Sequence, residues 1–178
     1  MRVLYWNVNG LGREKFCAIR KFLSQFDIIC LTETWVMDGL EGSFELCDFT
    51  LLISVGAYRR TDKGRRSGGI LVFVSKDIEP FITKIDSNKL KYNMVWLCYK
   101  QVAKKDLVIA FFYFSPKYSP HAILEPYEEL SIALTSVRNN LSINSSNDPA
   151  IIIIGDHNAR IGKLTDTHTE IAESSFKV

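Results

Sequence analysis

The chain has 178 residues, of which 47% are hydrophobic, 24% charged and 12% aromatic, and its formal net charge is +2. This composition is typical of one globular domain and excludes a collagen, a disordered tail and a disulfide-stapled mini-protein. The four cysteines are widely spaced, without a Cys-x-x-Cys pair, so the sequence predicts neither a disulfide framework nor a zinc site. No apolar run reaches the ~20 residues of a membrane helix and the start lacks a secretory signal, which favours a soluble, intracellular protein.

The first part of the chain alternates strand and helix patterns. Residues 2–8 predict a strand, because they are rich in Val, Tyr and Trp and are followed by the turn signal Asn9-Gly10. A helix is predicted next from apolar residues at helical spacing, namely Phe16, Ile19, Leu23 and Phe26. Residues 27–33 form an apolar run closed by polar residues, which is typical of a strand buried on both faces. Further strands are predicted at 49–55, 69–75, 94–101 and 107–114, with 80–85 as a weaker candidate.

The second part of the chain predicts one more helix and one more strand. Pro126 suits the first position of a helix, and apolar residues then follow at spacings of three and four, namely Tyr127, Leu130, Leu134, Val137 and Leu141. A polar loop is expected at 144–148. Residues 150–154 are the most strongly β-forming segment, and the polar run Gly155-Asp156-His157-Asn158 follows it. The tail at 163–178 is polar and without a clear period.

Polar side chains stand where three of these strands end. They are Asn7, then Glu33, and then Asp156 with Asn158. Strand ends are where an α/β scaffold collects functional groups. Carboxylate and amide oxygens are hard ligands, so this set predicts a Mg²⁺ site with few protein ligands, or a Mn²⁺ site, rather than zinc.

Five separated motifs resemble the endonuclease/exonuclease/phosphatase superfamily, and most of all the apurinic-endonuclease-like domain of non-LTR (LINE-type) retrotransposons. In chain order they are Trp6-Asn7-Val8-Asn9-Gly10-Leu11, Leu31-Thr32-Glu33-Thr34-Trp35, Ser67-Gly68-Gly69, Tyr113-Phe114-Ser115-Pro116 and Gly155-Asp156-His157-Asn158-Ala159-Arg160-Ile161-Gly162. The resemblance implies a four-layer α/β sandwich, with two β-sheets flanked by helices and incomplete at the C-terminus. We therefore expect a partial domain over residues 1–162 and a polar tail over 163–178.

The resemblance also implies a role for each site residue. Asn7 resembles the family's first-strand Asn that supports the metal site, and Glu33 resembles the Glu that binds Mg²⁺ directly. Tyr113 resembles the active-site Tyr near the scissile phosphate. Asp156 resembles the Asp that orients or deprotonates the attacking water, and Asn158 resembles the amide that contacts the phosphate.

Each of these positions also has a simpler interpretation. Asn7 and the run from Gly155 to Asn158 contain residues that favour turns, and a strand-end Glu such as Glu33 commonly lies in solvent. Tyr113 belongs to four consecutive aromatic residues, of which at least two must pack in a core. Trp35 is interpreted as a packing residue. His157 stands where the family commonly has an apolar aromatic residue, a change that we expect the site to tolerate.

The expected partner is DNA, with no membrane. Its phosphates could bind a basic cluster that contains Arg59, Arg60, Arg65 and Arg66, although such a cluster can also be an ordinary solvated loop. The resemblance implies a metal-dependent endonuclease that nicks DNA. Such an enzyme would be located in the nucleus if it acts on chromosomal DNA, and a reverse transcriptase would follow it in a longer polyprotein. The alternatives are a phosphoesterase for small molecules such as inositol phosphates or sphingomyelin, and a non-catalytic remnant that binds nucleic acid.

The sequence departs from the family at its end. The family closes with a Ser-Asp-His-type motif on a late strand, preceded by another Asp, and this chain has neither. Asp166-Thr167-His168 begins only ten residues after Asp156, which is too near to be the equivalent. We therefore expect a truncated fragment, and the resemblance leaves the enzymatic activity of the chain by itself open.

Overall fold

The structure is a computed structural model that describes residues 1–59, 64, 66–85, 94–101, 105–115, 126–142 and 149–158. Its strands are β1 (Val3–Asn7), β2 (Ile28–Thr32), β3 (Phe49–Val55), β4 (Ile70–Ser75), β5 (Ile82–Ile85), β6 (Met94–Tyr99), β7 (Leu107–Tyr113) and β8 (Ala150–Asp156). Its helices are α1 (Arg13–Leu23) and α2 (Pro126–Ser142), with short 3₁₀ turns η1 (Glu41–Ser43) and η2 (Glu79–Phe81). In the described part of the chain, neither helix is long and apolar enough to cross a membrane.

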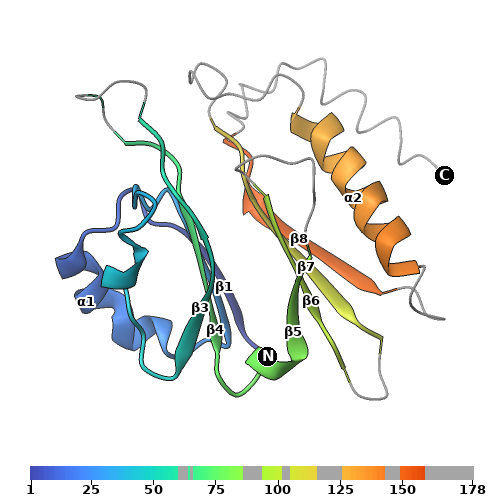
Figure 1. Ribbon diagram of the computed structural model, residues 1–178, viewed down its shortest axis with the longest axis horizontal. Helices are drawn as coiled ribbons and strands as arrows, with labels where there is room; N and C mark the ends of the chain where they lie inside the picture. The colour runs from blue at the N-terminus through green and yellow to red at the C-terminus, as the bar shows by residue number, and fades with distance from the viewer. Residues whose placement is uncertain are drawn as a thin grey trace, which may run out of the picture.

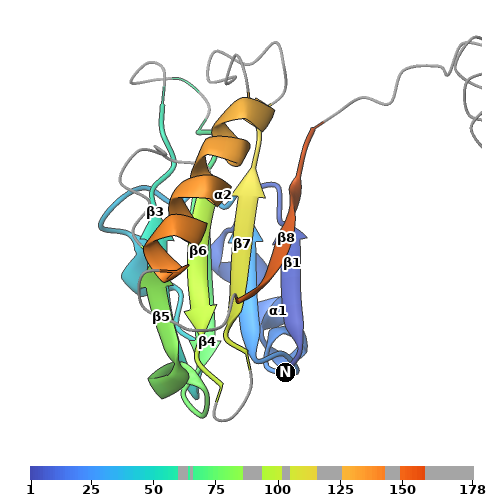
Figure 2. The ribbon, with the colours of Figure 1, turned by 90° about the vertical axis from the view of Figure 1, so that its right-hand side faces the viewer.

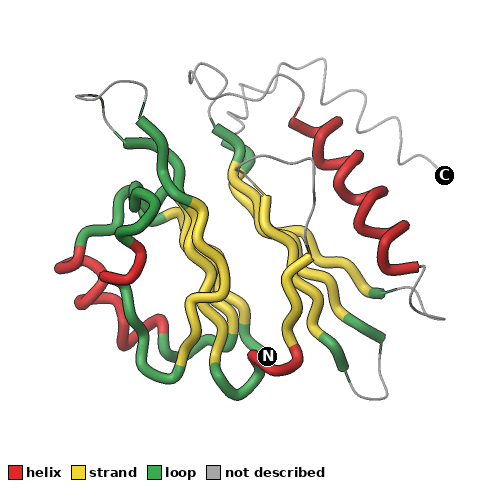
Figure 3. Tube along the Cα trace, in the orientation of Figure 1, coloured by secondary structure: helices red, strands yellow, loops and turns green. Residues whose placement is uncertain are grey.

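The strands form two four-stranded sheets. The first has the order β1-β2-β4-β3 and the second the order β5-β6-β7-β8. One pair in each sheet is parallel, β1 with β2 and β7 with β8, and the other pairs are antiparallel. The sheets pack face to face, with α1 outside the first and α2 outside the second (Figures 1 and 3). The expected four-layer α/β sandwich is thus confirmed.

Three apolar clusters hold the layers together. The middle cluster lies between the sheets and includes Ile28, Val72, Leu97, Ile109 and Phe111. The outer clusters lie under α1 and under α2, and alternate residues of one strand supply both faces. In β4, for example, Val72 faces the other sheet and Phe73 faces α1. This two-sided burial explains why the central strands appear in the sequence as continuous apolar runs.

The predicted strands are found with small differences at their ends. The candidate at 80–85 begins as the turn η2, because Pro80 has no N–H to donate, and becomes the strand β5 only at Ile82. The last strand runs beyond 154 to Asp156, because its parallel pairing with β7 continues to the partners Tyr113 and Asp156. Helix α2 begins at Pro126, as predicted. The polar stretch at 144–148 and the tail at 163–178 lie outside the described residues.

The arrangement brings distant strand ends together. Because β1 and β2 are parallel, and β7 and β8 are parallel, the strands of each pair end at the same edge of their sheet. Figure 2 shows β7 and β8 ending at the same end of the sandwich, with β1 and β8 side by side. The four predicted strand-end residues are therefore neighbours in space.

Candidate functional site

Asp156 joins the two sheets. It is the last residue of β8, and its Oδ2 accepts a hydrogen bond of 2.9 Å from Nδ2 of Asn7, the last residue of β1. Its Oδ1 accepts a bond of 2.9 Å from the backbone N–H of Asn158. These bonds fix the carboxylate while leaving each oxygen a lone pair for a further partner.

Glu33 lies in a backbone segment of unusual conformation. It directly follows β2, and its φ of 52° lies in the left-handed region that few residues other than glycine adopt. Its Oε1 accepts a bond of 3.0 Å from the backbone N–H of Gly68, and its Oε2 accepts one of 2.7 Å from Nε1 of Trp35. Backbone held in such a conformation by its surroundings is often found at functional sites.

Two glycines make room for this segment. A Cβ atom at Gly69, whose φ is 89°, would lie 2.5 Å from Oγ1 of Thr34. A Cβ atom at Gly10 would lie 2.4 Å from the ring of Trp35. The glycines of the first and third motifs thus allow the chain to pass close to the Glu33 segment.

Tyr113 is buried at the end of β7 and faces Glu33. Burial raises the pKa of its phenol well above the ordinary value, hydrogen bonding with the Glu33 carboxylate raises it further, and the Asn158 amide lowers it. The phenol therefore stays neutral and can donate a hydrogen bond. Asn158 has a φ of 44°, and its Nδ2 donates a bond of 2.8 Å to the backbone oxygen of Phe114.

The raised pKa of Tyr113 predicts a loss of stability at high pH. The unfolded phenol loses its proton near pH 10 and the folded one only at higher pH, so the free energy of unfolding should fall above pH ~10. At pH values where only the unfolded form is ionised, this residue lowers the free energy of unfolding by about 1.4 kcal/mol for each unit of pH. Urea unfolding between pH 9 and 11 (about one unit either side of the ordinary tyrosine pKa) should show a shallower decline for Tyr113→Phe.

The matched control for that measurement is Tyr127→Phe. Tyr127 lies on α2 with 57% of its surface exposed, so its replacement also removes one phenol but leaves the site intact. If the wild-type chain and Tyr113→Phe lose stability in parallel above pH ~10, the buried phenol is not the cause.

Sequence reasoning missed two residues of the site. Trp35, interpreted as a packing residue, donates its indole N–H to Glu33. Tyr5 lies between the sheets, where its hydroxyl donates a bond of 2.8 Å to the backbone oxygen of Phe112 and accepts one of 3.2 Å from Thr32. The position of Tyr5, two residues before Asn7 on the same face of β1, was the available signal.

His157 takes the place of an aromatic residue in packing. Its ring lies 4.7 Å from that of Phe112, 6.0 Å from that of Phe114 and 5.6 Å from that of Tyr127, measured between centroids. The ring, although exposed, thus contacts the first turn of α2, on the side of β8 away from Tyr113.

The basic cluster is described only in part. Arg59 is exposed, and Arg66 is half-buried with Nη1 3.5 Å from the backbone oxygen of Trp35. Arg60 and Arg65 lie outside the described residues. Next to Arg59 and Arg66, Tyr58 pairs with Ser67, and the Tyr58 hydroxyl lies 3.3 Å from Oγ of Ser115, two residues beyond the end of β7.

The donor set fits a hard divalent cation. Within the described residues there is no cluster of three or more His, Cys, Asp or Glu side chains that could hold a metal alone. The site offers instead the Glu33 carboxylate, which keeps one lone pair beyond its bonds from Gly68, Trp35 and Tyr113, together with oxygens of Asn7 and Asp156. Proteins commonly hold Mg²⁺ with few ligands of their own, all of them oxygen atoms.

Comparison with known proteins gives one family and one fold. Residues 4–170 match the Endonuclease/Exonuclease/phosphatase family, while no curated protein matches the chain. The AP endonuclease LMAP from Leishmania major has a TM-score of 0.66 and 14% identity, over 87% of this chain and 54% of that one. The Xenopus laevis APE2 catalytic domain has a TM-score of 0.56 and 17% identity, over 89% and 59%.

A third solved structure is the endonuclease domain of TRAS1, a telomere-specific non-LTR retrotransposon. Its TM-score is 0.48 and its identity 18%, over 89% of this chain and 59% of that one. The chain therefore spans between 54% and 59% of the length of these three structures. At these identities the first two likenesses concern the fold alone.

Proposed function

The chain belongs to the Endonuclease/Exonuclease/phosphatase family, and on that premise we propose that it is a Mg²⁺-dependent phosphodiesterase that nicks DNA. One observation carries the proposal. The residues Asn7, Glu33, Tyr113, Asp156 and Asn158, which come from four strand ends in two sheets, form one connected polar network. A folded chain has no structural need to gather two carboxylates and two amides at one end of a sandwich, so the network favours a catalytic use.

The proposed reaction is in-line attack of water on a phosphodiester. Asp156 is held by Asn7 and by the Asn158 backbone, and it orients the water and accepts its proton. Asn158 and the neutral Tyr113 donate hydrogen bonds to the phosphate oxygens as negative charge grows on them. Glu33 and Asn7 would hold the Mg²⁺, which when bound would neutralise charge on the phosphate and the leaving oxygen.

DNA is the proposed substrate because of the basic segment at the same end of the molecule. Arg59 and Arg66 belong to the connection between β3 and β4, and Nη1 of Arg66 lies 3.5 Å from the backbone oxygen of Trp35, which neighbours Glu33. Arginines beside a phosphodiester site can hold the neighbouring phosphates without reading sequence. The five motifs further support a retrotransposon-type endonuclease, for which a nuclear location and a downstream reverse transcriptase are part of the proposal.

The deciding experiment removes the metal. The purified chain is incubated with supercoiled plasmid in Mg²⁺ and, in parallel, in EDTA, and nicked circles are counted by gel electrophoresis. We expect nicking only in Mg²⁺, and less of it as salt concentration rises. Hydrolysis of inositol phosphates or sphingomyelin without nicking would instead identify a small-molecule phosphoesterase. DNA binding in EDTA without cleavage in either condition would identify a non-catalytic binding module.

A further inference from the structure

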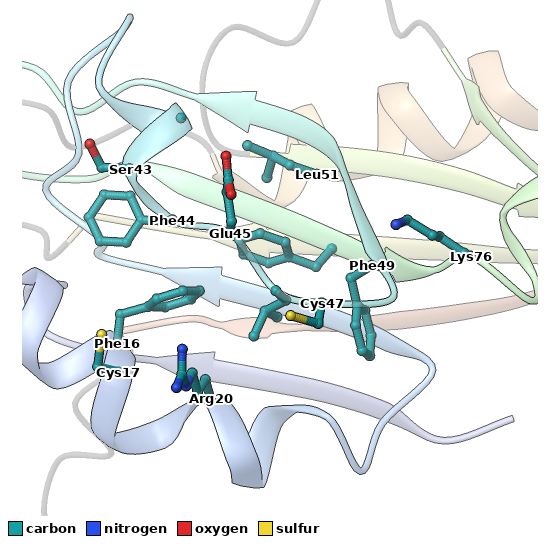
Figure 4. A pocket seen from close by; sticks show the side chains of 13 residues that line it. Phe16, Cys17, Arg20, Ser43, Phe44, Glu45, Cys47, Phe49, Leu51 and Lys76 are labelled. Carbon is teal, nitrogen blue, oxygen red and sulfur yellow. The ribbon is translucent and has the colours of Figure 1, made fainter.

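A cavity of about 720 Å³ opens on the outer face of the first sheet, between α1 and the connection from β2 to β3 (Figure 4). It exists because one short helix cannot cover four strands. The 11 residues of α1 make a cylinder about 16 Å long and 10 Å wide, whereas four strands span about 14 Å between the outer strand axes and carry side chains beyond them. The volume lies in the range of small-molecule sites, about 300 to 1,000 Å³.

The floor of the cavity is aromatic and its rim is charged. Phe16, Phe44 and Phe73 line it, and each is at least nine-tenths buried. Arg20 extends from the last turn of α1, and Lys76 stands on another side just after β4 (Figure 4). Neither of these two cations forms an ion pair with a carboxylate in the described part of the chain.

One carboxylate lowers the net positive charge of this rim. Glu45 lines the same cavity, so the charged side chains sum to 2 − 1 = +1. An apolar body would cover the half-exposed Phe49 and Leu51 beside the aromatic floor, and a single negative charge would be attracted to the two cations. A polyanion such as a nucleoside triphosphate would face repulsion from Glu45, and a neutral apolar molecule would leave the cations unused.

We propose that this cavity binds a small organic monoanion with an aromatic or aliphatic body, such as an aromatic sulfonate or a fatty carboxylate. The site is independent of the proposed nuclease function, because none of its lining residues belongs to the polar network at the strand ends. The ligand would lie between α1 and the β2–β3 connection and would replace water over the half-exposed Phe49 and Leu51.

The probe is anilinonaphthalene sulfonate, titrated into the full chain by calorimetry. Gly42 lines the cavity, and a Cβ atom there meets nothing within 4 Å, so Gly42→Phe should fill the space and abolish binding. Gly12→Phe is the matched control, because Gly12 also has open space around its Cβ and does not line the cavity. The control should bind as the wild type does.

The rim charges are tested by a second variant. Removing two exposed cations with the double variant Arg20→Ala/Lys76→Ala should weaken binding about tenfold, because contacts between exposed charges contribute modestly to affinity. The double variant Lys21→Ala/Lys105→Ala removes the same charge outside the cavity and should leave the affinity unchanged. Equal affinities for the two double variants would overturn the monoanion assignment.

The reactivity of the cysteines shows where on the protein the probe binds. Cys17 and Cys47 are exposed and line the cavity, whereas Cys30 and Cys98 are buried elsewhere. The bound probe should slow the alkylation of Cys17 and Cys47 by iodoacetamide, measured peptide by peptide in a mass spectrometer. Unreacted Cys30 and Cys98 show that each variant is folded. Binding that leaves the rates at Cys17 and Cys47 unchanged, or that survives Gly42→Phe, would place the probe elsewhere and refute the proposal.

Discussion

Replacement of Glu33 by glutamine is expected to lower Mg²⁺-dependent nicking by about three orders of magnitude. The reason is local. The carboxylate sits between two donors, the Gly68 backbone N–H at 3.0 Å and the Trp35 indole N–H at 2.7 Å. A glutamine amide has only one oxygen, so its NH₂ group would face one of these donors, and it carries no charge to hold a cation.

The measurement needs a readout besides activity. Binding of Mn²⁺ to the chain, followed by electron paramagnetic resonance, should weaken in Glu33→Gln in parallel with the loss of nicking. Asp77→Asn is the matched control, because Asp77 is exposed just after β4, at the opposite end of the sheet from Glu33, and its replacement also removes one carboxylate charge. Full Mn²⁺ affinity in Glu33→Gln would show that Glu33 is not the metal ligand, whatever happens to the rate.

Replacement of Phe111 by alanine is expected to lower the free energy of unfolding by about 4 kcal/mol. Phe111 is fully buried between the two sheets, where its ring stacks on Tyr5 at 6.4 Å between centroids. The loss is large against a total stability of about 5 to 15 kcal/mol for a domain. Because Asn7 lies in one sheet and Asp156 in the other, weaker packing between the sheets should also impair the site.

Urea denaturation measures this effect, with Phe81→Ala as the matched control. Phe81 ends the turn η2 and is 44% exposed, so its truncation should change stability by about 0.5 kcal/mol or less. Equal losses in the two variants would contradict the assignment of Phe111 to the core between the sheets. A loss in Phe111→Ala alone, with nicking reduced as well, would connect sheet packing to the site.

The sequence alone determined most of the strands and helices and predicted which polar residues form the candidate site. The buried strands were predictable because a strand covered on both faces must be apolar throughout, as residues 27–33 are. Asn7, Glu33 and Asp156 were predictable as a group because each is a polar residue at the end of such a run. The five motifs also carried the resemblance to the family that the family match confirms.

Only the tertiary structure decided which atoms meet. Asn7 and Asp156 are 149 positions apart, and nothing in either local pattern specifies that β1 and β8 come side by side in facing sheets. Local patterns also could not predict the hydrogen bond from Trp35 to Glu33, because that contact depends on left-handed backbone at both residues. The cavity beside α1 likewise depends on how much of a sheet one helix covers. Spacing along a chain determines which face a side chain occupies, whereas the packing of whole layers determines what that side chain contacts.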